Sequence, residues 1–130
     1  MTLQVLVDAD NVDAARVRTL LAALPADAQV VAAGRPAALD AVDWPAAAVL
    51  LEAAGWQTAD LALAGAYVPS EDPLVLVSGD SDFALLARRH AGPVLVVSEA
   101  ASHQLHRHVP VHDPAVDDPE DLRRWLDAVL

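Results

Sequence analysis

Short runs of apolar residues alternate along the chain with segments whose apolar positions recur at helical spacing. This alternation is typical of βαβ units and predicts an α/β fold with a mainly parallel sheet. The apolar runs predict strands at Leu3–Val7, Gln29–Ala33, Leu74–Val77 and Val94–Val97, and a short extended piece at Val109–Val111. The remaining pattern predicts helices at Asp13–Leu24, Pro36–Ala41, Ala46–Ala54, Ala59–Tyr67, Ser81–His90, Ala100–Arg107 and Pro119–Leu130.

Capping signals set several of these boundaries. Asp118 before Pro119 is a strong start for the last helix, because an Asp side chain can accept the free backbone N–H groups of a first turn. Asp43 and Pro45 give the same signal for the helix Ala46–Ala54, and Gly55 is a natural end for it. Trp56-Gln57 is expected to be a brief strand or a bend.

Composition is compatible with one ordinary domain over residues 1–130. The chain is 55% hydrophobic, which is enough to bury a core. No apolar stretch approaches the roughly 20 residues of a membrane span, and no basic leader opens the chain. We therefore expect a soluble cytoplasmic protein without a membrane partner. The chain has no cysteine, which excludes disulfides and thiolate metal sites.

The charge balance limits the function classes. The formal net charge is −11, and all 8 basic side chains are arginines. Non-specific nucleic-acid binding depends on Lys and Arg that neutralise phosphates, so tight autonomous binding to RNA is not expected. A bound metal ion can nevertheless supply local positive charge at an acidic nucleic-acid site.

Acidic residues follow two of the predicted strands. Asp8 and Asp10 come directly after the first strand, and Asp80 and Asp82 follow Leu74–Val77. In open α/β sheets the ligand crevice lies beyond the carboxyl ends of the strands, so the four carboxylates would meet there if these strands are neighbours. Oxygen ligands of this kind suit Mg²⁺, and a metal-bound water suits phosphate-ester hydrolysis.

Helix capping is the simpler explanation of any single one of these acids, and Ser81 or Asp82 can serve as such a cap. Two strand ends with the same acidic pattern favour the metal site over capping. Asn11 can be a turn residue, or its amide can hold a carboxylate or a phosphate oxygen. Ser78 and Ser81 lack the neighbours of a nucleophile, and Arg35 is a candidate phosphate contact.

Four segments in order give the chain a family resemblance. They are Asp8 with Asn11, the Ala59-Asp60 pair, the run Ser78-Gly79-Asp80-Ser81-Asp82-Phe83, and Ser102 with Leu105. Together they resemble the NYN domain, a branch of the PIN-like nuclease superfamily. The resemblance covers about residues 3–111, and the Ser-Gly-Asp-Ser-Asp-Phe run is its most specific part.

The resemblance implies a three-layer α/β/α sandwich and a metal-dependent ribonuclease. Mg²⁺ or Mn²⁺ would be held by Asp8, Asp60, Asp80 and Asp82, which would also be the catalytic residues. Asp60 enters this set through the resemblance, because its own position at a helix start is explained equally well by capping. The predicted substrate-binding residues are Asn11, Ser78, Ser81, Arg35 and Ser102.

Other functions stay open. A catalytically weak or inactive PIN-like interaction module is compatible with the −11 charge, as is a homodimer or a protein partner. A haloacid-dehalogenase-type phosphatase also begins with an Asp-x-Asp motif, here Asp8-Ala9-Asp10. That chemistry normally needs a lysine beside the phosphoaspartate, and this chain has none.

Overall fold

Six parallel strands form one sheet in the computed structural model, which describes residues 2–55, 58–99 and 109–130. The strand order is β3-β2-β1-β4-β5-β6. The strands are β1 (Gln4–Asp8), β2 (Gln29–Gly34), β3 (Val49–Glu52), β4 (Leu74–Val77), β5 (Val94–Val97) and β6 (Val111–His112). The chain runs outward from β1 to one edge and then returns to place β4 on the other side of β1.

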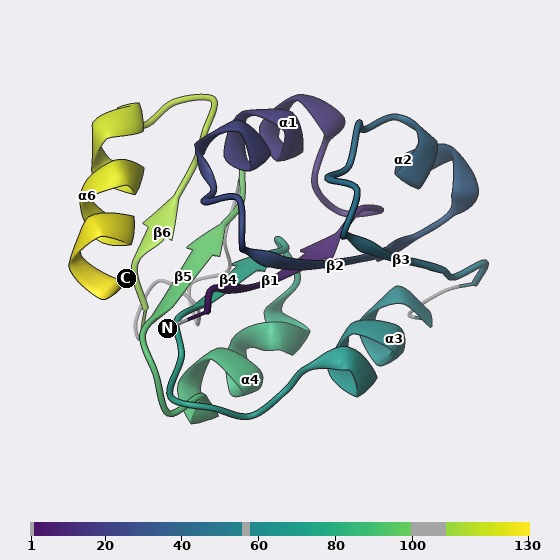
Figure 1. Cartoon of the computed structure of the whole chain (residues 1–130). Helices are drawn as coiled ribbons and strands as arrows, with labels where there is room; N and C mark the ends of the chain where they lie inside the picture. Colours follow the sequence, from purple (N-terminus) through teal and green to yellow (C-terminus); the bar gives the residue numbers. More distant parts are fainter. Residues whose placement is uncertain (1, 56–57, 100–108) are drawn as a thin grey trace.

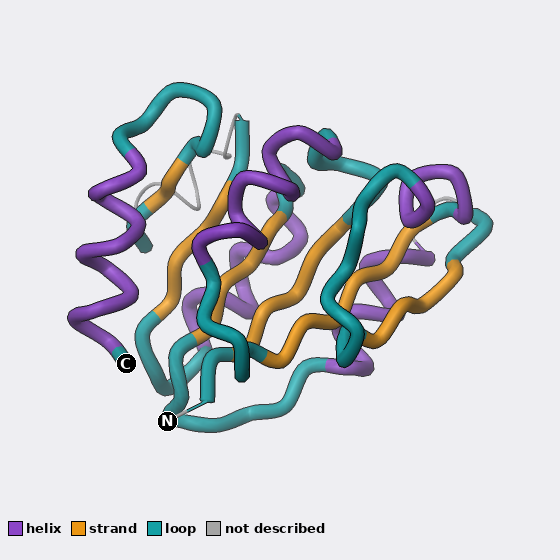
Figure 2. The backbone as a smooth tube through the Cα atoms, turned by 45° about the horizontal axis from the view of Figure 1, so that its top comes forward, coloured by secondary structure: helices purple, strands orange, loops and turns teal. Residues whose placement is uncertain are grey.

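Helices cover both faces of this sheet, as Figures 1 and 2 show. The first face carries α1 (Ala14–Ala23), α2 (Pro36–Asp40) and α6 (Pro119–Val129), and the second carries α3 (Thr58–Ala66), the 3₁₀ turn η1 (Ser81–Phe83) and α4 (Ala84–Arg89). The expected three-layer α/β/α architecture with a parallel sheet is confirmed.

Side-chain alternation along β1 divides the core in two. Val5 and Val7 pack with α1 and α6, whereas Leu6 packs with α3 and α4. Successive residues of a strand point to opposite faces, so Asp8 shares the face of Leu6. Leu6 pairs with Leu76 of β4, so these two side chains lie on the same face of the sheet. Ser78 lies two residues after Leu76 and therefore points to that face as well. Asp8 at the end of β1 and Ser78 directly after β4 are thus directed toward the α3 layer.

The helix predicted at Ala46–Ala54 is wrong. Residues Val49–Glu52 instead form β3, which pairs in parallel with β2 at the edge of the sheet. Alanine and leucine favour a helix locally. Pairing with β2 prevails because it satisfies the backbone groups along that strand's open side. The proposed cap at Asp43 and Pro45 does not start a helix either, since Ala48 N–H closes a turn onto the Pro45 carbonyl.

The other expected elements agree closely with the structure. The helix expected at Ser81–His90 begins as η1 and continues as α4. The extended piece expected at Val109–Val111 shares only Val111 with the strand β6, which begins there and ends at His112. Asp118 caps α6 through the Glu120 N–H, as its spacing predicted. The helix expected at 100–107 and the bend at 56–57 lie outside the described residues. No described helix has both the length and the apolar character needed to cross a bilayer.

A tight contact closes the amino-terminal edge of the sheet. The His90 ring lies between the Tyr67 hydroxyl and the Asp72 carbonyl oxygen, with both contacts at 2.6 Å. A Cβ added to Gly92 would lie closer than 3.0 Å to the carbonyl oxygens of Glu71 and Asp72. Glycine is therefore required at position 92 so that the two loops can approach each other.

Replacing Gly92 with alanine should lower the free energy of unfolding by about 1–3 kcal/mol, because the backbone must shift to relieve the overlap. The matched control is Gly65→Ala in α3, where an added Cβ meets no atom within 4 Å. That change should stabilise the protein by up to about 1 kcal/mol, because alanine is the better helix former. Urea unfolding measures both, and equal midpoints for Gly92→Ala and wild type would contradict the packing described.

Candidate metal centre

The carboxylate of Asp8 lies at the centre of the carboxyl edge of the sheet. It is the last residue of β1 and is 0% exposed. The Asn11 amide and the Ser78 hydroxyl both donate to its Oδ2, at 2.5 and 3.3 Å. These two donors, one from each side of the β1–β4 junction, fix the orientation of the carboxylate.

The second oxygen of Asp8 is buried and has no hydrogen-bond partner among the described residues. Burial raises the pKa of Asp8, while hydrogen bonding from Asn11 and Ser78, and to a smaller extent from the Asp60 carboxyl and the Asp10 backbone, works in the opposite direction. A buried carboxylate oxygen without a donor is costly unless a proton or a cation balances it. The Asp8 carboxylate therefore requires a proton or a cation close by, and the adjacent Asp60 carboxyl can supply the proton.

Asp80 is placed by the turn that follows β4. Its backbone N–H donates to Ser78 Oγ at 3.0 Å, and its Oδ1 accepts the Asp82 N–H at 3.0 Å. Asp80 therefore caps the turn that follows it, which is the simpler explanation for an acid at this position. The same bonds also fix the carboxylate at the mouth of the site. Ser78, only 3% exposed, serves both Asp8 and this turn.

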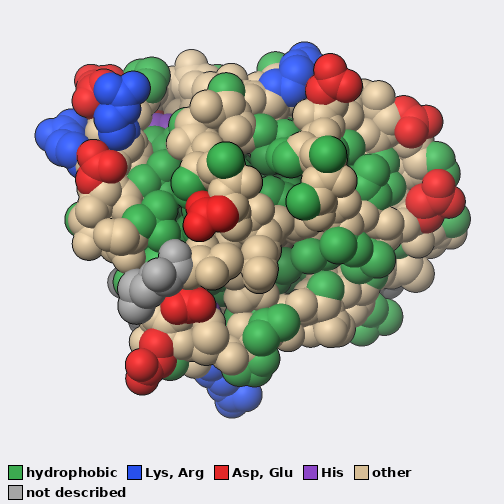
Figure 3. Space-filling view, in the orientation of Figure 1, with side chains coloured by type: hydrophobic (Ala, Val, Ile, Leu, Met, Phe, Trp, Pro, Cys, Tyr) green, Lys and Arg blue, Asp and Glu red, His purple; other side chains and the backbone are tan. Residues whose placement is uncertain are grey.

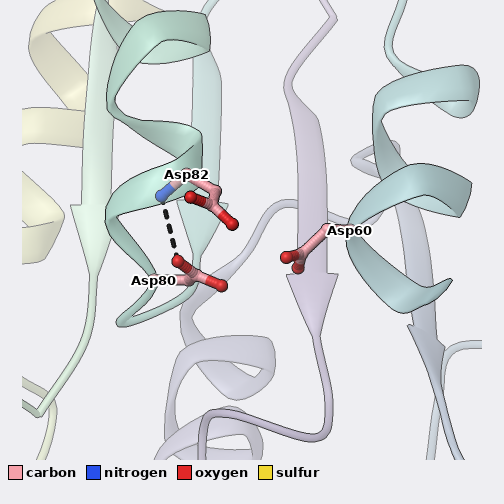
Figure 4. A group of neighbouring side chains, drawn as sticks. All are labelled: Asp60, Asp80 and Asp82. Carbon is pink, nitrogen blue, oxygen red and sulfur yellow. Dashed lines mark hydrogen bonds between the residues drawn. The ribbon is translucent and has the colours of Figure 1, made fainter. Parts of the chain in front are cut away.

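Asp60 approaches from the opposite side, in the first turn of α3. Figure 4 shows its carboxylate facing those of Asp80 and Asp82 across the space between α3 and η1. One oxygen from each of these three residues lies within 4.8 Å of the others. Three of the four acids predicted as metal ligands therefore converge at one place. Asp8 is not part of this group, although its carboxyl lies next to that of Asp60.

The close approach of these acids perturbs Asp60 most clearly. Its pKa is raised to about 7, first by burial and then by the neighbouring charges of Asp8 and Asp80. Like charges that share a site disfavour ionisation, so without a cation the cluster holds a proton on Asp60 near neutral pH.

A cavity of about 500 Å³ opens beside the acids. It is lined by Asp10, Asn11, Arg35, Gly55, Ala59, Asp60, Asp80 and Asp82. Arg35 is the one cation among these lining residues, and its backbone N–H donates to Asp10 Oδ1 at 3.0 Å. A Cβ at Gly34 would lie 3.2 Å from that same oxygen, so the glycine lets the loop after β1 come close to the end of β2.

The structure thus brings together seven of the predicted site residues: Asp8, Asn11, Arg35, Asp60, Ser78, Asp80 and Asp82. The side chain of Ser81 and the whole of Ser102 lie outside the described residues. Asp10 lines the cavity although the predicted ligand set omits it. Its place directly after β1, two residues from Asp8, was the available sequence signal.

A second group of acids nearby shares one arginine. Arg16 of α1 contacts Asp13 and Asp113 at 2.8 Å and Glu99 at 3.3 Å. The guanidinium lowers the pKa of both Asp13 and Asp113. These carboxylates have a protein cation and link α1 to the loops after β5 and β6. By contrast, no Lys or Arg contact to the Asp60–Asp80–Asp82 cluster occurs in the described residues.

Comparisons with models of known protein families and with curated proteins found no match to this chain. The resemblance to NYN domains therefore depends on the motif residues alone and stays a prediction.

The raised pKa of Asp60 predicts how stability varies with pH in the absence of metal. The folded protein binds this proton more tightly than the unfolded chain, whose carboxyl has a pKa near 4. Stability should therefore fall as pH rises from about 4 to 7, and then level off. Asp60→Asn should flatten this fall and, at pH 8, stabilise the protein by about 1–2 kcal/mol after allowance for solvent screening.

Urea unfolding in EDTA at pH 5 to 8 measures this effect. Asp127→Asn, an exposed change on α6, is the matched control and should keep the wild-type slope. Asp13 and Asp113, whose pKa values are lowered, change stability mainly below pH 4. Asp8, whose pKa is raised, also lowers stability as pH rises, so Asp60→Asn should keep a smaller residual slope. A wild-type stability that rises between pH 5 and 8 would contradict the assignment.

Proposed function

We propose that this protein is a metal-dependent ribonuclease whose acidic site binds Mg²⁺ or Mn²⁺. The observation that carries the proposal is the unpartnered, fully buried Oδ1 of Asp8 beside three converging carboxylates. An acidic cluster alone is common on protein surfaces. A buried carboxylate oxygen without a donor, next to an Asp60 whose pKa is raised by burial and by neighbouring carboxylates, supports a metal ion more strongly.

The donor set fits a hard divalent cation. Asp8, Asp60, Asp80 and Asp82 offer only oxygen atoms, and no His or Cys lines the cavity among the described residues. Mg²⁺ and Mn²⁺ prefer such ligands. When bound, the ion would polarise a phosphoryl group and lower the pKa of a coordinated water, which is the chemistry of phosphodiester hydrolysis.

The surrounding residues have distinct roles in this proposal. Asn11 and Ser78 orient Asp8, and the Asp82 N–H orients Asp80. Asp60, whose pKa is raised to about 7, would give up its proton near neutral pH if a cation were bound beside it. Arg35, on the cavity wall, is the candidate contact to a substrate phosphate.

The acidity of the chain argues for weak, local contact with RNA. On the face seen in Figure 3, basic side chains occur in separate small groups rather than in one patch. Phosphate neutralisation by the surface is therefore limited, and affinity would depend on the metal site itself. This also keeps open the alternative of an interaction module that binds the ion without cleaving RNA.

The phosphatase alternative is less favoured. Its mechanism needs Asp8 as a nucleophile, but this side chain is 0% exposed and bound by Asn11 and Ser78. The chain also has no lysine to sit beside a phosphoaspartate.

Asp80→Asn should reduce Mn²⁺-dependent cleavage of a labelled single-stranded RNA by about 100-fold or more. Loss of an outer partner of a metal site already costs about 10–100-fold, and Asp80 is proposed as a direct ligand. The asparagine can still accept the Asp82 N–H, so the turn should be preserved. Asp127→Asn, the same chemical change on α6, should cleave like wild type.

Calorimetry with Mn²⁺ completes this test. Wild type and Asp127→Asn should bind the ion, and Asp80→Asn should bind it at least about tenfold more weakly. Equal RNA cleavage by all three proteins would contradict the proposal. Metal binding without cleavage by wild type would instead support the interaction module.

A further inference from the structure

A second, apolar hollow of about 290 Å³ lies between α3 and the η1–α4 segment. Its lining residues are Asp60, Leu61, Ala64, Asp82, Phe83 and Leu86. Asp60 and Asp82 also line the acidic cavity, so the two spaces meet at these carboxylates. The hollow therefore begins where the proposed metal site ends, and we call it the α3–α4 groove.

The walls of the α3–α4 groove are unsuited to phosphate. Its ionisable lining residues are the two carboxylates, and no Lys or Arg lines it among the described residues. The side chain of Leu61, on one wall of the groove, is 72% exposed. Phe83, which also lines the groove, is buried and only 5% exposed. A ligand that covers Leu61 would remove apolar surface from water, which is favourable in proportion to the area covered.

We infer that the α3–α4 groove binds one nucleobase of the substrate, next to the phosphate held at the acidic cavity. This inference rests on the proposed ribonuclease function and assigns it a base-binding site. A base has apolar faces that match Leu61, Ala64 and Leu86. It also has edge N–H groups that carboxylates can accept, as Asp and Glu accept the amino group of cytosine.

The size of the groove favours a base over a protein segment. Ligand pockets usually span about 300–1,000 Å³, so this hollow is at the lower limit and suits one small flat group. A docking helix would need anchor pockets spaced at successive turns. The carboxylates at the mouth also give selectivity, because cytosine presents an amino donor where uracil presents a carbonyl oxygen.

The binding test uses cytidine 5′-monophosphate, uridine 5′-monophosphate and ribose 5-phosphate with the ¹³C-methyl-labelled protein in excess Mg²⁺. We expect the cytidine nucleotide to shift the Leu61 and Leu86 methyl signals and to bind about tenfold more tightly than the uridine nucleotide. Ribose 5-phosphate should leave both signals in place. Equal shifts from all three compounds would overturn the inference.

Variants separate the groove from the rest of the surface. Leu61→Asn should weaken binding of the cytidine nucleotide about fivefold or more, since an apolar contact is lost. Leu85→Asn is the matched control, because Leu85 is 53% exposed on α4 and does not line the groove. Ala64→Leu fills the groove and should weaken binding without adding a polar atom. Weakening by Leu85→Asn equal to that by Leu61→Asn would contradict the site.

Cleavage assays distinguish failure of this inference from failure of the ribonuclease proposal. Binding of the cytidine nucleotide in the groove without cleavage of any RNA would reject the ribonuclease and retain the base site. Equal cleavage of cytidine and uridine homopolymers by wild type and Leu61→Asn would reject the base site and retain the ribonuclease. Leu61 signals that move only with a basic amphipathic peptide would identify a protein partner and overturn the inference.

Discussion

The arrangement of polar groups at the carboxyl edge of the sheet depends on how the charge of one buried carboxylate is balanced. Asp8 ends the central part of the sheet with no exposed surface, and an ionised group in that position must be balanced locally. Asn11 and Ser78 satisfy one oxygen. The other oxygen has no described donor, so the proton held by Asp60, or a cation in its place, determines whether the cluster is stable.

The order of the strands creates this situation. After β3 the chain returns to the centre, and β4 pairs with β1. The return passes through α3, the first helix on its face of the sheet, and the start of that helix brings Asp60 to the strand ends. The crevice beside β1 and β4 is the point where strand order reverses, which is where parallel α/β sheets bind their ligands.

Charge balance separates the two groups of acids at this edge. Around Arg16, three carboxylates share one guanidinium and link the loops after β5 and β6 to α1. The Asp60 cluster has no such partner in the described chain. Its neighbours are instead an open acidic cavity and an apolar groove. The first arrangement includes a protein cation that links three elements, whereas the carboxylates of the second have none among the described residues.

The sequence by itself determined the four inner strands, most of the helices and the acids after β1 and β4, because strand runs, caps and turns are local patterns. It failed for Ala46–Ala54, where alanines favour a helix but the open side of β2 requires a strand. Asp60 could be placed in the site only through the family resemblance, since nothing in its local spacing relates it to Asp8. Tertiary structure decided that convergence, and with it the raised pKa of Asp60 and the unpartnered oxygen of Asp8. Both depend on which face α3 covers and on the distance between groups more than 50 residues apart, which no local pattern contains.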